Sequence, residues 1–352
     1  MTETAAPILS VRNLVVEAVG ASAPVRIVDG VSFDVHAGEV FGIVGESGSG
    51  KSITMLAVMG LLSGRTRLAG GEVKLRGRSL TDMSREELRR IRGRHVSMIF
   101  QDPMTSLNPV LRIGNQIAEI LEIHQPGLTR AAVRDRVIEL LSLVGVPSPE
   151  RRYRQYPHEF SGGMRQRAMI AMAIANNPDI LIADEPTTAL DVTIQAQVME
   201  LLLAVRTRNQ AAMILITHDL GLVAETVDRV AVMYGGRLME EGPVDEIFSR
   251  PAHPYTLGLM ASRPRLDAAP EFLYSIPGQP PSLSNRPSGC VFNPRCAMQN
   301  GREICVTTVP SLGRASPNLQ GMTHNTACHF SGEIEGWIGA IAGGRDAMRE
   351  TS

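Results

Sequence analysis

Short apolar runs recur along the first 240 residues and predict the strands of one sheet. They are Val40 to Val44 and residues 96–100, 180–183 and 213–216. Uninterrupted runs of this length are typical of strands that a parallel sheet buries on both faces. Residues 51–62 and most of 102–175 carry apolar side chains at helical spacing, for example Ile117, Ile120 and Leu121. Strands and helices in alternation predict an α/β fold.

Glycine and proline divide the rest of the chain. Glycines near residues 38, 70 and 77 separate short strands of a predicted antiparallel β-subdomain, and residues 234–237, Tyr-Gly-Gly-Arg, are typical of a hairpin turn. Proline and glycine become frequent from Pro251 to Pro287, which predicts a linker and an irregular tail. We therefore expect a main domain over residues 1–250, with a helical subdomain at about 102–175, and an extension over 251–352.

A glycine-rich loop separates the first apolar run from a helical segment. Its residues are Gly45, Glu46, Ser47, Gly48, Ser49, Gly50, Lys51 and Ser52. Strand, glycine loop and helix in this order predict a phosphate-binding loop, in which backbone N–H groups converge on phosphate oxygens. Lys51 would add positive charge near the β- and γ-phosphates, and Ser52 a hydroxyl for Mg²⁺. The alternative is a plain strand–helix turn with a solvated lysine.

Two adjacent carboxylates, Asp184 and Glu185, end the run at residues 180–183. Successive side chains of a strand point to opposite faces, so the two acids can have separate roles. Asp184 would hold Mg²⁺, and Glu185 would orient and deprotonate an attacking water. Taken alone, the pair could equally be two solvated acids at a strand end.

Gln101 and His218 also follow apolar runs. Taken singly, a glutamine after a strand is commonly polar surface, and a lone histidine is usually structural. Their order after the glycine loop favours one common site, with Gln101 at the Mg²⁺ and catalytic centre and His218 near the γ-phosphate.

The segment Ser161-Gly162-Gly163-Met164-Arg165-Gln166-Arg167 resembles the signature sequence of ATP-binding-cassette (ABC) proteins. With the glycine loop, Gln101, Asp184-Glu185, Ala189-Leu190-Asp191 and His218, it resembles the motif set of that family over about the first 250 residues. The resemblance implies a P-loop ABC ATPase core with an antiparallel β-subdomain and an α-helical subdomain, working as a dimer.

The same resemblance implies a nucleotide site shared between two subunits. Ser161 and Gly163, with Gly162 between them, would reach the γ-phosphate bound to the partner subunit, and Asp191 would communicate across the dimer. Residues 14–30 contain no aromatic side chain where the family often stacks one on adenine, and Ala18 falls near that place. We therefore expect weak discrimination between bases, with Arg26 or an aliphatic side chain as the substitute.

The C-terminal third narrows the resemblance. His253-Pro254-Tyr255-Thr256, residues 276–281 and residues 289–296 resemble the tail of ATPase subunits from dipeptide, oligopeptide and nickel importers. This implies two membrane permeases, a second ATP-binding subunit, identical or paralogous, and an extracytoplasmic binding protein as partners. It also implies a peripheral position at the cytoplasmic face of the plasma membrane.

All four cysteines lie in this tail, at Cys290, Cys296, Cys305 and Cys328. The N-terminus shows no signal-peptide pattern, so a reducing compartment is expected and disulfides are disfavoured. Clustered thiols there suggest a metal centre, and the importer resemblance implies a 4Fe-4S cluster. Zinc remains open, although paired C-x2-C knuckles are missing, and so do free or regulatory thiols.

Composition excludes some functions. The formal net charge is 35 minus 36, or −1, and aromatic residues make up 4%, so neither a basic patch nor a stacking platform predicts nucleic-acid binding. No apolar run approaches the roughly 18 to 20 residues that cross a bilayer. The leading prediction is an ATPase subunit that powers peptide uptake. The alternatives are an importer of nickel or another solute, a non-transport ABC ATPase in DNA repair or translation, and a redox or iron–sulfur sensor.

Overall fold

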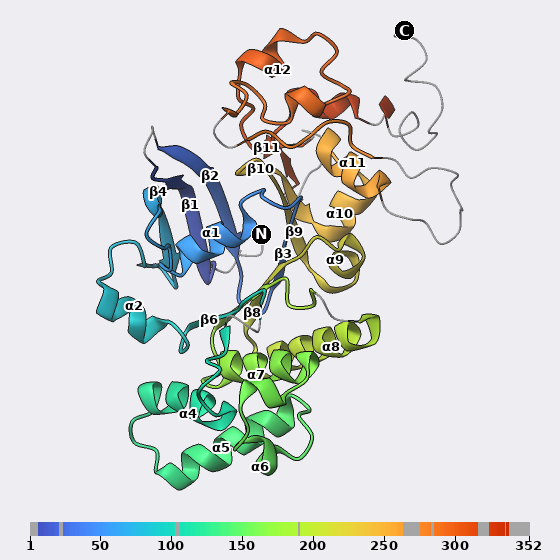
Figure 1. The fold of residues 1–352 in the computed structure, drawn as a ribbon. Coiled ribbons are helices and arrows are strands. Elements are labelled where there is room, and N and C mark those ends of the chain that lie inside the picture. Colours follow the sequence, from blue (N-terminus) through green and yellow to red (C-terminus); the bar gives the residue numbers. More distant parts are fainter. Residues whose placement is uncertain are drawn as a thin grey trace.

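The computed structural model of the chain describes most of its 352 residues. The described residues are 6–20, 24–102, 106–188, 191–262, 275–282, 285–315, 324–334 and 336–337. They form two sheets, a group of helices below the larger sheet in the view of Figure 1, and a tail at the top.

The larger sheet has eight strands in the order β11-β12-β10-β9-β3-β8-β7-β6. These are β3 (Val40–Val44), β6 (Val96–Ile99), β7 (Ile180–Asp184), β8 (Ala212–Ile216), β9 (Arg229–Tyr234), β10 (Arg237–Pro243), β11 (Gly313–Arg314) and β12 (Asn325–Thr326). The five strands from β9 to β6 run parallel, whereas β10, β12 and β11 pair antiparallel. The predicted parallel sheet is confirmed.

Strand β3 shows why its apolar run is uninterrupted. Phe41 and Ile43 face a core shared with the smaller sheet, whereas Val40 and Val44 face a core under the helices. Because successive side chains alternate between two buried faces, no position of this strand can be polar.

The smaller sheet has four antiparallel strands in the order β2-β1-β4-β5. They are β1 (Leu9–Ala18), β2 (Val25–Val35), β4 (Thr66–Leu75) and β5 (Arg78–Ser79). They confirm the antiparallel β-subdomain expected from the glycine pattern. Between β9 and β10, Gly235 and Gly236 have φ of 53° and 82°, which gives the predicted two-residue hairpin turn.

Helices cover the larger sheet and extend below it. They are α1 (Lys51–Val58), α2 (Arg85–Ile91), α4 (Ile113–His124), α5 (Arg130–Leu143), α6 (Pro149–Arg152), α7 (Gly162–Ile174), α8 (Val192–Asn209), α9 (Leu220–Thr226), α10 (Val244–Ser249), α11 (Pro254–Ala261) and α12 (Glu303–Thr307). Helices α4 to α7 fall within the segment expected to be helical and lie together in Figure 1.

Helix α1 ends earlier than the apolar spacing predicts. We expected it to continue to Leu62, but its last residue is Val58. Gly60 has φ of 62°, its N–H donates to Ala57 O at 3.0 Å, and the N–H of Leu61 donates to Leu56 O at 2.7 Å. This pair of bonds is the Schellman arrangement, which stops a helix at a left-handed glycine.

The tail is mostly irregular but is not detached from the sheet. Strand β12 pairs with β10, Glu240 with Thr326 and Glu241 with Asn325. Val291 and Phe292 belong to the core beneath the helices. Two-residue strands carry no detectable periodicity, so the sequence pattern missed these additions to the sheet.

Candidate nucleotide site

The phosphate loop leaves β3 and enters α1 with backbone angles that require glycine. Gly45 has φ of 149°, and a Cβ on it would lie 2.0 Å from Met233 O. Gly50 has φ of 103° directly before Lys51, the first residue of α1. The loop therefore brings successive N–H groups to a helix N-terminus, the geometry that binds phosphate.

Lys51 is folded back onto its own loop. Its Nζ donates to Gly45 O at 2.8 Å and to Glu46 O at 3.0 Å, and the residue is buried. Burial lowers the pKa of Lys51, while the carboxylates of Glu185 and Asp184 oppose that shift. The ammonium is thus close to the loop and to both acids, where a triphosphate would need positive charge.

Ser52 and Asp184 are direct neighbours, although 132 residues separate them in sequence. The Ser52 hydroxyl donates to Asp184 Oδ1 at 2.9 Å. Burial raises the pKa of Asp184, and the Ser52 hydrogen bond opposes this. A hydroxyl and a carboxylate are oxygen donors of the kind Mg²⁺ prefers, so these residues fit a magnesium ion.

Glu185 is held by three side chains. Gln101 Nε2 donates to its Oε2 at 2.8 Å, Thr188 Oγ1 donates to the same oxygen at 2.9 Å, and His218 Nδ1 lies 3.5 Å from Oε1. Glu185 also has φ of 46°, a left-handed value that costs a non-glycine residue about 1 kcal/mol. The structure thus brings Gln101, Glu185 and His218 together. Thr188 is not among the predicted site residues; its only signal in the sequence is its place in the turn after the two acids.

The signature residues begin helix α7. Ser161 caps the helix, its Oγ accepting from the N–H of Met164 at 3.3 Å. Ser161 and Gly162 are exposed, and Gly163 is half-buried beside Ile194 of α8. Among the described residues, no hydrogen bond or ion pair joins them to the phosphate loop, and Figure 1 shows α7 below β6 and β8, whereas α1 lies to the left of β3.

A hydrogen bond connects the signature helix to the turn that follows the two acids, and Asp191 caps the neighbouring helix α8. The buried Gln166 donates from Nε2 to Pro186 O at 2.7 Å, directly after Glu185. Asp191 caps α8 by accepting from the N–H of Ile194 at 3.0 Å, and it is exposed. Ala189 and Leu190, which complete the predicted motif, lie outside the described residues. Gln166 was not predicted as a functional residue; its position within the signature was the available signal.

The four cysteines are free thiols in the described tail. Cys290 donates its N–H to Cys305 O at 2.8 Å. Burial raises the pKa of all four thiols, to about 12 for Cys296 and about 11 for Cys328, and neighbouring cysteines contribute to the shifts at Cys290, Cys296 and Cys328. Within the described ranges no three His, Cys, Asp or Glu side chains form a group that could hold a metal ion. The expected iron–sulfur or zinc centre therefore has no support in this geometry.

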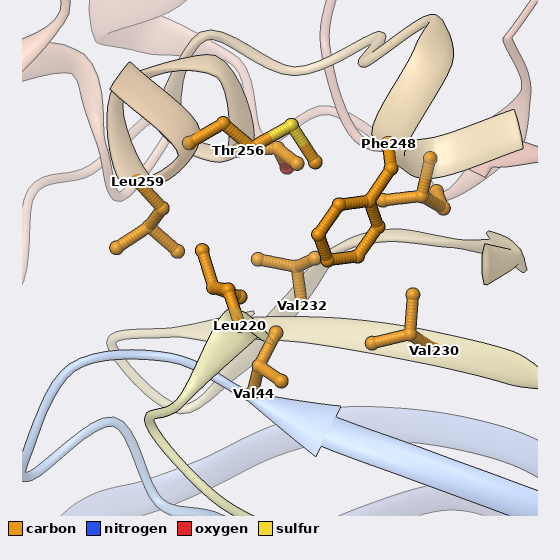
Figure 2. A pocket seen from close by; sticks show the side chains of 9 residues that line it. Val44, Leu220, Val230, Val232, Phe248, Thr256 and Leu259 are labelled. Atoms are coloured by element: carbon orange, nitrogen blue, oxygen red, sulfur yellow. The ribbon is translucent and has the colours of Figure 1, made fainter. Parts of the chain in front are cut away.

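A groove and a small void lie outside the phosphate loop. A groove of about 490 Å³ lies between β6, α4 and α7, and Phe100, Ile123 and Met172 are among its lining residues. A second void, shown in Figure 2, measures only about 10 Å³ and lies under α9, α10 and α11. Its lining is almost wholly apolar, so it is a packing defect with space for one water at most.

Comparison with known proteins places these features in a family. The ABC transporter family matches residues 28–188, and the C-terminal region of oligopeptide/dipeptide transporters matches residues 239–305. A probable peptide ABC transporter ATP-binding protein of Sinorhizobium fredii is 48% identical, covering 93% of this chain and 96% of that protein. The dipeptide transport ATP-binding protein DppD of Bacillus subtilis is 51% identical over 86% of this chain and 90% of its own length.

Solved structures agree with the sequence relatives. An ATP-binding cassette in a dimeric post-hydrolysis state, bound to ADP and phosphate, matches with a TM-score of 0.61 and 26% identity, covering 67% of this chain and 98% of that one. A cassette from the cbiONQ transporter complex of Clostridium perfringens matches with a TM-score of 0.58 and 27% identity, covering 69% of this chain and 91% of that one. No helix in the described ranges is long and apolar enough to span a membrane. The chain therefore belongs to the ABC family of ATP-binding subunits of oligopeptide and dipeptide transporters.

Proposed function

We propose that this chain hydrolyses ATP to power peptide uptake through a membrane ABC importer. The observation that carries the proposal is the assembled set around Glu185, with Gln101, Thr188 and His218 as its partners. This set lies beside a lysine and a Ser52–Asp184 pair at the end of a glycine loop. Hydrolysis needs a positioned water, a base and charge stabilisation, and these side chains can supply all three.

In this mechanism, the loop N–H groups and Lys51 bind the β- and γ-phosphates, and Lys51 exchanges its two carbonyl partners for phosphate oxygens. Ser52, Asp184 and the side-chain oxygen of Gln101 would hold Mg²⁺, which supplies charge neutralisation on the phosphates. Glu185 Oε1, the oxygen that faces His218, accepts a proton from the attacking water. His218, with an exposed side chain, steadies the γ-phosphate beside it.

The site is completed by a second copy or a paralogue. Ser161 and Gly162 are exposed at the start of α7, Gly163 is half-buried, and among the described residues no hydrogen bond or ion pair joins them to their own phosphate loop. A partner's Ser161–Gly163 turn would therefore close over the bound nucleotide. Asp191 would communicate this closure across the dimer to the second nucleotide site. Splitting the site makes hydrolysis depend on dimer closure.

The permeases would dock in the groove between β6, α4 and α7. The groove begins next to Gln101, and Phe100 and Ile123 remain 37% and 47% exposed. Apolar side chains at this exposure suit a short amphipathic cytoplasmic helix of a permease. In this proposal the chain lies at the cytoplasmic face of the membrane as a peripheral subunit, and a binding protein delivers the peptide on the other side.

We also propose that residues 1–250 form the nucleotide-binding domain, with its helical subdomain at about 102–175, and that 251–352 form the importer-type extension. The four cysteines would hold a 4Fe-4S cluster when the protein is loaded. Neighbouring cysteines contribute to the raised pKa values of Cys290, Cys296 and Cys328, so these thiols lie near one another, while burial favours the protonated thiols in the metal-free chain. Iron and sulfide analysis of anaerobically purified protein, with a Cys296→Ser variant beside it, tests this; colourless wild-type protein without iron would refute it.

The transport function is tested with the full chain, its two permeases and its partner cassette in lipid vesicles. We expect ATP-dependent uptake of a labelled peptide. Lys51→Ala should abolish uptake and ATP binding, whereas Lys74→Ala, the other lysine of the chain, should leave both unchanged because Lys74 pairs with Glu72 on the surface. Hydrolysis without uptake, and failure to co-purify with the permeases, would overturn the importer function.

Docking has its own test. Ile123→Asp should reduce co-purification with the permeases because it places a charge in the groove. Val309→Asp, at a similar exposure of 41% in the tail, is the matched control. Equal binding of both variants would remove the groove as the docking site.

A further inference from the structure

The phosphate loop is fastened to the C-terminal tail through one residue, Glu46. Arg295 Nη1 donates to Glu46 Oε2 at 2.8 Å, across 249 residues of sequence. The N–H of Glu46 donates to the hydroxyl of Tyr255 at 2.8 Å. The carbonyl of Glu46 accepts from Lys51 Nζ at 3.0 Å. Glu46 is thus held at its side chain, its N–H and its carbonyl, and the last of these contacts involves the phosphate-binding lysine.

Arg295 is itself rigidly held. Its side chain is 6% exposed, Nε donates to Pro277 O at 2.9 Å, and Nη2 donates to Ile276 O at 3.2 Å. Nη1 also donates to the hydroxyl of Tyr234 at 3.2 Å. With partners on three nitrogens, the guanidinium cannot follow a moving loop and acts as a fixed point for Glu46.

Aromatic packing anchors the other contact. The rings of Tyr255 and Tyr234 have centroids 4.6 Å apart, and Phe292 lies 5.3 Å from each of them. Tyr255 belongs to α11 and Phe292 to the tail turn that ends at Arg295. The tail therefore presents a hydroxyl and a guanidinium on one packed unit, facing the same loop residue.

We infer that Arg295 is a positioning residue for ATP: by holding the Glu46 carboxylate, it keeps the phosphate loop in its binding conformation. The inference rests on the proposed ATP site and adds a residue outside the sequence motifs. A loop rich in glycine loses much conformational entropy when it becomes ordered, so a contact that orders it beforehand improves binding. In the described part of the chain no hydrogen bond or ion pair joins Arg295 to Glu185 or Asp184, so it acts on binding and not on the chemical step.

The test measures binding of Mg-ATP to the full-length chain by calorimetry, in a Glu185→Gln background that prevents turnover. Arg295→Gln should raise the Kd on the order of 10-fold, because a charged hydrogen bond to Glu46 is lost. In the otherwise unchanged chain, the same substitution should raise the KM for ATP by a similar factor and leave kcat within about 2-fold. Arg295→Lys should restore only part of the affinity, because the lysine ammonium cannot reproduce the planar set of N–H donors of a guanidinium.

Two further variants separate positioning from loosening of the tail. Arg302→Gln removes the ion pair between Arg302 and Glu333, which lies in the same tail but does not touch the phosphate loop. This variant should leave the Kd for Mg-ATP unchanged. Glu46→Ala should weaken binding like Arg295→Gln, and the double variant should be no weaker than either single one. If Arg295→Gln fails to fold, Glu46→Ala alone removes the contact from the other side.

The outcomes are distinct. Unchanged Kd in folded Arg295→Gln, equal weakening by Arg302→Gln, or additive effects in the double variant would overturn the inference. Lys51→Ala serves as the reference for the ATP site itself. If Lys51→Ala also binds Mg-ATP normally, the proposed nucleotide site is wrong; if only Arg295→Gln binds normally, the site stands and the tail contact has no role in binding.

Discussion

Replacing Glu185 by glutamine tests the chemistry of the site with the smallest change in its shape. Two donors, Gln101 Nε2 and Thr188 Oγ1, converge on Glu185 Oε2 at 2.8 and 2.9 Å. A glutamine can place its carbonyl oxygen there and keep both hydrogen bonds. Its NH₂ group then replaces Oε1, which lies 3.5 Å from His218 Nδ1. The site keeps its geometry, but that position can no longer accept a proton from water.

The size of the effect follows from this difference. Loss of a positioned general base costs about 10²- to 10⁴-fold in turnover, which corresponds to about 3 to 5 kcal/mol in activation free energy. Binding should remain, because the contacts of Lys51 and of the Ser52–Asp184 pair do not pass through Glu185. We therefore expect kcat to fall while the Kd for Mg-ATP stays within about 3-fold of the original value.

The assay is phosphate release at saturating Mg-ATP by the chain assembled with its permeases, with Kd measured separately by calorimetry. Glu225→Gln is the control, because Glu225 is an exposed glutamate in α9 and no hydrogen bond in the described structure links it to the site. Near-normal turnover by the Glu185 variant would show that another group accepts the proton. A large loss of ATP binding would show that Glu185 has a structural role in the loop.

Three other properties can be measured directly. Thr256→Val should leave the free energy of unfolding unchanged or raise it by about 1 kcal/mol, because the Thr256 hydroxyl is buried at the small void without a hydrogen-bond partner. A clear fall of the melting temperature would contradict this. Burial raises the pKa of Glu241 to about 7 from 4.5, so its contribution to stability is complete below pH 4.5 and is lost as pH rises towards 7. Denaturant unfolding from pH 4.5 to 8 should show this decline, and Glu241→Gln should lack it; identical pH profiles would rule the cause out. The Kd values for ATP and GTP should lie within about 10-fold of each other, because β1 ends at Ala18 and offers no aromatic ring on which adenine could stack. A strong preference for ATP in a competition assay would refute this.

Much of the core fold could be predicted from local pattern. The run Val40–Val44 is apolar at every position because its side chains alternate between two cores, and this pattern is visible without a structure. Helix α2 begins with a capping box of Ser84 and Glu87, whose residues are three apart. Such features depend on neighbours within a few residues, so the sequence contains all the information they need.

Two features of the fold were not predicted, for different reasons. The end of α1 at Val58 is local, because Gly60 in a left-handed conformation stops the helix although the apolar pattern continues to Leu62. Strand β12 depends on a distant segment, because its two residues pair with the edge of β10 and are too few to show a period.

For the candidate site, the sequence by itself determined the glycine loop, the adjacent acids and the residue types that phosphate and magnesium require. Only the tertiary structure decided that Thr188 and Gln101 share one oxygen of Glu185, and that Arg295 of the tail reaches Glu46 of the loop. The physical reason is that a backbone conformation depends on a few adjacent residues, whereas a hydrogen bond across 249 residues depends on how the whole core packs.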